Sequence, residues 1–420
     1  MLGKLTSAIA SLTTSSSLPP LHHAPPRVES YAKLAKELDS ASVPVSTSDC
    51  STCDDPCASQ AGSTGAGTIA EVYEGKSYND YVNDKYGDLG ELPSGFDVDW
   101  DSELQGSAKG GRGRVVVIST GKSDWERDHT DEKDSLAHHL NKVIEAAPTP
   151  AAPKTEESKR SPDLPYIAPA ALPPPSAPLT YPVQTPPSLY SSSLITQSDD
   201  PSDQTVLVFP DWKVIHEVEN SREGAKGLYD AALAGELGRA GTQGAEESGI
   251  GRIRSWVLPY RAVVLLCSHK RRDKRCHIAA PLLRAALHTC LEKHDITIDE
   301  TGSSLSHLAG PPLEEVEGSE AEREAEVGKR IKSIDSVDGG DGGEVGIFNI
   351  NHLGGHRYAG VMLILFPSGA YISYGRVTPQ EIPRVVEDTI LQGKIVPGLL
   401  RNAVGVSRPD GKAGKGFLTW

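Results

Sequence analysis

Cysteine and aromatic residues are scarce in this chain of 420 residues. Its six cysteines are too few to frame a secreted, disulfide-held domain, and the N-terminal segment lacks the apolar region and cleavage pattern of a secretory signal. Aromatic residues make up 5 % and hydrophobic residues 37 %. We therefore expect a protein of a reducing compartment, in which about 250 to 280 residues form cores.

The sequence also has no excess of basic residues and no long apolar run. Its 42 Lys and Arg residues face 57 Asp and Glu residues, a formal net charge of −15, which argues against nonspecific nucleic-acid binding. The longest apolar runs, residues 262–266 and 360–366, fall far short of the ~18 residues that a membrane span requires. We expect a soluble protein with neither nucleic acid nor a membrane as partner.

Two enzyme signatures are incomplete. The string STGKS at residues 119–123 follows a predicted strand, but Val116 occupies the position where a phosphate-binding loop requires glycine. A glycoside hydrolase needs two carboxylates that face each other across a sugar cleft, and no such pair can be placed among the acidic residues. A glycosidase is therefore not expected, whereas an oxidoreductase activity remains open beside a role without catalysis.

Proline and glycine, in contrast, are abundant and divide the chain. Thirteen of the 31 prolines lie between residues 148 and 187, where they fix the backbone and remove amide donors. An acidic, glycine-rich stretch at about 313–344 is expected to bury almost nothing. The expected organisation is a disordered arm (1–44), a smaller N-terminal α/β domain (45–145), a proline-rich linker (146–194), a second domain (195–400) that contains the acidic insertion, and a C-terminal tail (401–420).

Hydrophobic patterns predict the elements of both domains. A strand at 114–120 and a helix from about 125 to 145 precede the linker, and a strand at 205–209 follows it. The remaining elements alternate as β-α-β-β-β-α, with strands at 262–266, 346–350, 361–366 and 371–374 and helices at 280–293 and 379–392. This order is typical of a thioredoxin-like core.

Cysteine and histidine occur in pairs at the ends of two predicted strands. Cys267 and Cys276 enclose the loop CSHKRRDKRC, where helix amides and basic side chains favour thiolates. His352 and His356 lie in NHLGGHR, whose glycines allow a tight turn that brings both rings to one point. Either pair alone is more often inert packing, but both lie at the same end of one predicted sheet. Together they predict a four-ligand metal site, with His277 as the nearest rival ligand.

Four motifs resemble the sucrase/ferredoxin-like family. They are WVLPYRAVVLLCSHKRRDKRC, NINHLGGHRYAGVMLILFPSG, CSTCDDPC and VVVISTGKSDW, and the similarity covers roughly residues 45–145 and 195–420. The resemblance implies that the second domain is a thioredoxin-like ferredoxin. It also implies a [2Fe–2S] cluster held by Cys267, Cys276, His352 and His356.

Three arginines near these residues are expected to tune such a cluster. Arg271, Arg275 and Arg357 would stabilise its reduced, more negative form through nearby positive charge. A solvated basic loop is the alternative interpretation for each of them.

Two further motifs lie near the ends of the chain. Cys50, Cys53 and Cys57 have spacings that resemble a ferredoxin run but lack a fourth local ligand, so redox-active thiols and a second metal site both remain open. Trp420, in the terminal Leu-x-Trp, resembles the tail by which the cytosolic assembly machinery recognises some iron–sulfur proteins. It is expected to be accessible.

The sequence therefore favours an electron-transfer protein with an iron–sulfur centre, and it leaves the electron donor and acceptor unnamed. A non-redox interaction protein is the alternative, because two cysteines and two histidines also bind structural Zn²⁺. The expected compartment is the cytoplasm, with the nucleus also open. Mitochondria are the second choice, because the Ser-rich N-terminal segment is poor in the arginine that is typical of import signals.

Overall fold

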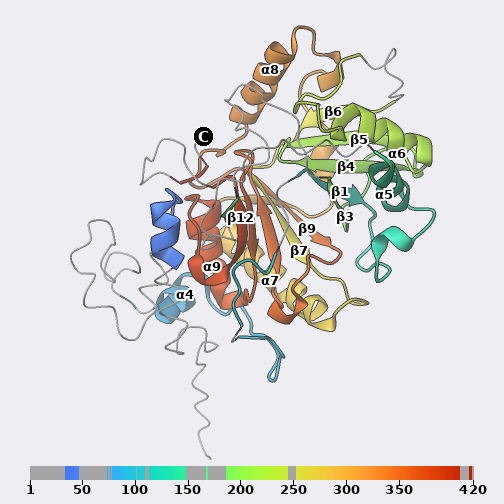
Figure 1. Cartoon of the computed structure of the whole chain (residues 1–420). Helices are drawn as coiled ribbons and strands as arrows, with labels where there is room; N and C mark the ends of the chain where they lie inside the picture. The colour runs from blue at the N-terminus through green and yellow to red at the C-terminus, as the bar shows by residue number, and fades with distance from the viewer. Residues whose placement is uncertain are drawn as a thin grey trace, which may run out of the picture.

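The computed structural model describes residues 34–46, 73, 76, 78–100, 102–108, 113–147, 167–168, 186–244, 252–406 and 416–418. They form a mixed α/β fold, as the sequence predicts, and all twelve strands belong to one sheet (Figure 1). The strands are β1 Val115–Ser119, β2 Ile167–Ala168, β3 Ser188–Ser192, β4 Asp203–Phe209, β5 Lys213–Glu219, β6 Arg254–Val257, β7 Ala262–Cys267, β8 Thr297–Asp299, β9 Glu344–Ile350, β10 Met362–Leu365, β11 Tyr371–Tyr374 and β12 Leu400–Val404. The helices are α4 Tyr78–Tyr86, α5 Leu136–Ala146, α6 Arg222–Leu228, α7 Lys274–Glu292, α8 Glu320–Lys332 and the short α9 Ile382–Arg384.

Two groups of four strands repeat one arrangement within this sheet. The order β5-β4-β1-β3 in the first half matches β11-β10-β7-β9 in the second half. In each half the first strand of the group along the chain is parallel to the second and antiparallel to the third. The third and fourth strands form an antiparallel hairpin. The halves meet through an antiparallel contact between Ser192 of β3 and Ile350 of β9. Because equivalent edges pair with each other, an approximate twofold axis relates the two thioredoxin-like halves.

This repeat corrects the expected domain boundaries. β1 lies before the proline-rich segment, but it pairs with β3 and β4, which lie after it. Residues 188–192, expected to belong to the linker, form a strand inside the sheet because Ser188–Ser192 align with Val115–Ser119 over their whole length. The first half thus draws on both sides of the proline-rich segment.

Strand β7 is buried on both of its faces. Ala262, Val264 and Leu266 pack into the apolar cluster that contains α7, whereas Val263 and Leu265 point into the cluster that contains α8. A strand covered on both faces has a continuous apolar sequence, as residues 262–266 do. The last residue of this rigid strand, Cys267, is thereby held at a buried position.

The acidic segment at 313–344 is folded, contrary to expectation. Ser319 and Glu322 form a capping box at the start of α8, which satisfies free amides of its first turn. Val327 and Ile331 of this helix are buried against the sheet. The spacing of four residues between them places both on one helix face, so a helix that is acidic overall still buries an apolar side.

Both expected irregular ends also contain ordered residues. Residues 34–40 form a helix whose Leu34 and Leu38 are buried, although 1–44 was expected to be a disordered arm. β12 pairs with β11, and the Phe417 ring contacts the Phe366 ring at 5.2 Å between centroids, although 401–420 was expected to be a tail. Apolar residues within these polar stretches belong to the same buried apolar cluster as residues of the sheet.

Two helices begin at capping residues that hydrophobic periodicity did not identify. Ser135 accepts a hydrogen bond from the His138 amide, so α5 begins at Leu136 and not near residue 125. Asp273 accepts one from the Arg275 amide, so α7 begins at Lys274, six residues before the expected start. No helix in the described part of the chain combines the length and hydrophobicity that crossing a bilayer requires.

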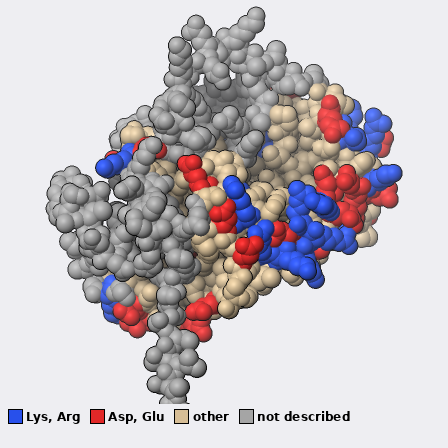
Figure 2. Space-filling view, turned by 60° about the horizontal axis from the view of Figure 1, so that its bottom comes forward, with Lys and Arg blue, Asp and Glu red and all other residues tan. Residues whose placement is uncertain are grey.

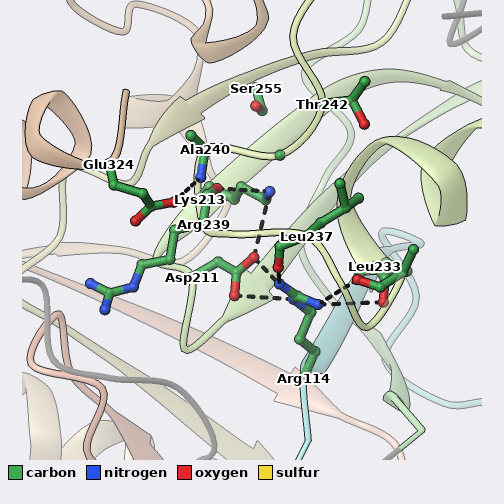
Figure 3. Close-up of polar contacts among 12 residues, drawn as sticks. Arg114, Asp211, Lys213, Leu233, Leu237, Arg239, Ala240, Thr242, Ser255 and Glu324 are labelled. Carbon is green, nitrogen blue, oxygen red and sulfur yellow. Dashed lines mark hydrogen bonds and ion pairs between the residues drawn. The ribbon is translucent and has the colours of Figure 1, made fainter. Parts of the chain in front are cut away.

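A buried ionic network holds the loop after α6 to the first half (Figure 3). The Arg114 guanidinium binds the Asp211 carboxylate at 3.1 Å and donates to backbone carbonyls at 233–237. The Lys213 ammonium lies 3.5 Å from the same carboxylate and donates to the Arg239 carbonyl at 3.0 Å. Burial lowers the pKa of Lys213, and the Asp211 carboxylate opposes this shift.

We expect Asp211→Ala to lower the free energy of unfolding by about 3–5 kcal/mol, because it leaves two buried cations without their counterion. Urea denaturation followed by circular dichroism measures this loss. The matched control is Asp230→Ala, which removes an exposed partner of Lys226 and should change stability by at most about 0.5 kcal/mol. Equal losses in the two variants would show that the network contributes no more than a surface ion pair.

Candidate metal centre

The two cysteines of the predicted site lie together at the end of β7. Cys267 is the last residue of the strand, and its amide donates to the Val361 carbonyl at 3.1 Å. Cys276 lies in the first turn of α7. The side chains are 2 % and 1 % exposed, neither forms a disulfide, and their thiols are hydrogen-bonded to each other. The structure therefore brings the predicted cysteine pair together.

The two histidines lie in the loop after β9, the parallel neighbour of β7. Gly354 and Gly355 adopt positive φ angles of 74° and 69°, which turn the chain so that the two rings approach. The ring centroids of His352 and His356 are 5.3 Å apart. A Cβ at position 355 would lie 2.3 Å from Nη2 of Arg401, so a larger residue there would displace this guanidinium. The expected tight turn between the imidazoles is confirmed.

Contacts link the cysteine pair to the histidine pair. The Cys267 sulfur accepts hydrogen bonds from the His352 side chain and from the Leu353 amide. Nδ1 of His352 and Nδ1 of His356 are both buried and have no hydrogen-bond partner among the described residues. Because nearly all buried polar atoms in proteins are paired, two unpartnered imidazole nitrogens side by side indicate a ligand that they are arranged to bind.

The site favours one thiolate, on Cys267, and a neutral His356 imidazole. Hydrogen bonds from Cys276, His352 and the Leu353 amide hold the pKa of Cys267 well below its usual range and outweigh burial. The pKa of Cys276 is raised, because its thiol donates to Cys267 and is buried. Burial lowers the pKa of His356 despite the nearby Asp273 carboxylate, so this ring is neutral at pH 7 and ligand-competent.

These four side chains form two couples, one of thiols and one of imidazoles. Within the described ranges, no three His, Cys, Asp or Glu side chains surround a point where a single metal ion would bind. Thiolate and imidazole are nonetheless the donors that iron–sulfur clusters and zinc use. The donor chemistry fits both an iron–sulfur cluster and zinc, and the division into couples helps to distinguish these two groups.

The three predicted arginines lie around the site, and each has an acidic partner. Arg271 forms an ion pair with Glu126, Arg275 pairs with Asp273 at 2.9 Å and Asp97 at 3.1 Å, and Arg357 lies 3.6 Å from Asp99. Their charge is therefore largely neutralised by these partners. The predicted tuning of a cluster by these residues stays a prediction.

Arg401 is a site residue that the sequence analysis missed. It is fully buried on β12 and donates to the Ser107 hydroxyl at 3.1 Å, beneath the histidine loop. Burial lowers the pKa of its guanidinium, whereas Cys267 and Cys276 favour its charged form. An arginine in the apolar stretch LRNAV is the signal that would have identified it.

Trp125 is the second residue that was missed, and it comes from the other half of the molecule. Its carbonyl lies 3.0 Å from Nε2 of the buried His269, and the two rings meet edge to face. Asp124 accepts a hydrogen bond from the Arg271 amide at 3.2 Å. The loop after β1 thus holds the cysteine loop in place.

The remaining residues nominated from the sequence lie elsewhere. Cys290 lies on α7 and is buried in the core, and His277 is exposed beside Cys276. Cys50, Cys53, Cys57 and Trp420 lie outside the described residues.

Comparisons with known proteins place these features in a family. The sucrase/ferredoxin-like family model matches residues 104–402, which include most of both halves of the sheet. The chain is 30 % identical over 132 residues to actin patches distal protein 1 of Saccharomyces cerevisiae, and these residues cover 31 % of this chain and 30 % of that protein. It is 27 % identical over 142 residues to altered inheritance of mitochondria protein 32 of Clavispora lusitaniae, covering 34 % and 35 %.

Each alignment spans only about a third of the relative, and no solved structure matches the chain. The family model, in contrast, covers well over half of the 420 residues. The chain belongs to the sucrase/ferredoxin-like family.

Proposed function

We propose that this chain is an iron–sulfur electron-transfer protein that holds a [2Fe–2S] cluster through Cys267, Cys276, His352 and His356. The observation that supports it most is the pair of buried, unpartnered imidazole nitrogens beside two buried thiols in hydrogen-bond contact. When bound, such a cluster takes up and releases one electron.

The arrangement in couples favours a two-iron group over zinc. Structural zinc requires four ligands around one ion, whereas in a [2Fe–2S] centre each iron takes two protein ligands. The cysteine couple and the histidine couple have this division. Zinc remains the second candidate, because the donor types suit it equally well.

The protein's own residues prepare the site for a positively charged group. Cys267 is held as a thiolate by three donors, and Cys276 is left to lose its proton when the group binds. His356 is neutral, so its ring nitrogen is free to act as a ligand. The buried charge of Arg401 stabilises negative charge on both sulfurs.

Anaerobic purification followed by visible spectroscopy and metal analysis tests the proposal. We expect a red-brown protein with about two iron and two sulfide per chain, and an EPR signal that appears on reduction with dithionite. A colourless protein with one zinc per chain would replace the cluster by the zinc alternative. A metal-free protein that cannot be reconstituted with iron and sulfide would overturn both.

We also propose a cytosolic location, supported by the terminal Trp420, with the nucleus and mitochondria as alternatives. An indole is a large side chain that an assembly factor can recognise by apolar contact. The preceding Phe417 and Leu418 are buried, so the recognised element would be short. Fractionation of cells that express the tagged chain tests the location.

Deleting Trp420 should lower the iron content of protein isolated from eukaryotic cells, while reconstitution in vitro restores the wild-type spectrum. The physical reason is that recognition acts during cluster loading and the described site does not involve residue 420. A Trp420→Ala variant should behave like the deletion, because it removes the indole. Full iron loading of both variants in cells would exclude a role as an assembly signal.

A further inference from the structure

The loop between the two cysteines carries three exposed cations, one of which, Arg272, acts on the nearby Asp128 carboxylate. Lys270, Arg272 and Lys274 are exposed, and within the described ranges none of them forms an ion pair. Their neighbours Arg271 and Arg275 are neutralised by Glu126, Asp273 and Asp97, as described above. The unpaired charge on this loop is therefore positive.

This charge lies directly at the rim of the metal centre. The three residues stand between Cys267 and Cys276 in the chain, and the Arg272 charge acts on the His356 ring. Ile278, half a turn after Cys276, is 38 % exposed and is one of two large apolar side chains exposed in the described structure. An apolar contact within a basic rim is the usual composition of a docking surface for a charged partner.

Basic and acidic side chains are mixed on the face of the molecule that Figure 2 shows. The start of α7 lies at the lower end of the molecule in Figure 1, and Figure 2 turns that end toward the viewer. Lys and Arg side chains gather on one part of this face, with acidic side chains beside them. The chain as a whole carries a net charge of −15, so most of its surface repels an acidic protein.

We propose that Lys270, Arg272, Lys274 and Ile278 form the docking surface for an acidic electron-transfer protein that exchanges electrons with the metal centre. The inference rests on the proposed electron-transfer function. An acidic partner is repelled by the rest of the surface and attracted by this loop, so that it arrives in the orientation that brings its own redox group closest to the cysteines and histidines.

The test uses the full-length, cluster-loaded chain and a reduced acidic [2Fe–2S] ferredoxin as probe. Stopped-flow absorbance should show electron transfer that slows at least about tenfold in the Lys270→Glu, Arg272→Glu, Lys274→Glu triple variant, and that slows in the wild type as salt is raised. The extent of reduction by excess dithionite should be unchanged. The control variant Lys142→Glu, Lys226→Glu, Lys329→Glu reverses three exposed lysines elsewhere and should react like the wild type.

Binding of fluorescently labelled ferredoxin, followed by anisotropy, separates this inference from the proposed function. Salt-sensitive binding that only the loop variant loses supports the surface even in protein without iron. An iron-loaded protein whose ferredoxin binding is equal in the loop and control variants overturns it. Preferred binding of a basic probe, reduced cytochrome c, or salt-sensitive self-association through the loop would also overturn it.

Discussion

Replacing Cys267 or Cys276 by serine is expected to abolish the visible absorbance of the purified protein. Serine keeps the size of the side chain, but its hydroxyl does not lose its proton at neutral pH and is a poor ligand for iron. The effect should be complete in each single variant, because both thiols are buried in one hydrogen-bonded couple and no other described cysteine lies near them. Absorbance at about 400–600 nm and iron content per chain measure the outcome.

Cys290→Ala is the matched control for this experiment. Cys290 lies on the same helix as Cys276 and is equally buried, but its neighbours are core residues, and burial raises the pKa of its thiol. The variant should keep full colour and lose only a small amount of stability. Serine in place of Cys50, Cys53 and Cys57 together should also leave this chromophore intact. A coloured Cys267→Ser variant with normal iron content would remove the cysteine couple from the site.

The double substitution His352→Cys, His356→Cys should lower the midpoint potential by on the order of a few hundred millivolts. With two thiolates and two neutral imidazoles the oxidised centre carries no net charge, whereas four thiolates give it two negative charges. Adding an electron to the more negative centre requires more free energy. Redox titration monitored by EPR measures the shift.

His277→Cys serves as the control for the histidine experiment. His277 is exposed beside Cys276, and neither its contacts nor its burial resemble those of the histidine couple. Its substitution should leave the potential within the error of the titration. A double variant that binds a cluster at the wild-type potential would show that the two histidines are not ligands.

Local patterns were sufficient for the second half of the molecule. The apolar runs at 262–266 and 361–366 and the Pro-Ser-Gly-Ala turn predicted β7, β10 and β11, and the structure has β11 at Tyr371–Tyr374 as expected. The cysteine and histidine couples were predicted to share one end of a sheet because each follows a buried strand. The strands that precede these couples, β7 and β9, are parallel neighbours in the sheet. The ends of strands can be recognised from consecutive residues, so the position of each couple after an apolar run was sufficient to predict this arrangement.

Non-local pairing escaped the sequence analysis. The pairing of β1 with β3 and β4 joins residues on opposite sides of the proline-rich segment, and no local period encodes such a partner. α8 was misjudged because charge dominates its composition, while its burial depends on only a few apolar side chains. The ionic network around Asp211 also depends on residues that are far apart in the chain.

The sequence by itself therefore determined the family, the mixed α/β class and the four candidate ligands, because motifs and strand ends are written in consecutive residues. Tertiary structure alone decided how these ligands are supported. It placed Arg401 under the histidine loop, brought Trp125 from the other half against His269, and left three cations of the cysteine loop exposed. The physical reason is that burial and charge neutralisation depend on which distant segments meet, and that meeting is set by the packing of the two halves into one sheet.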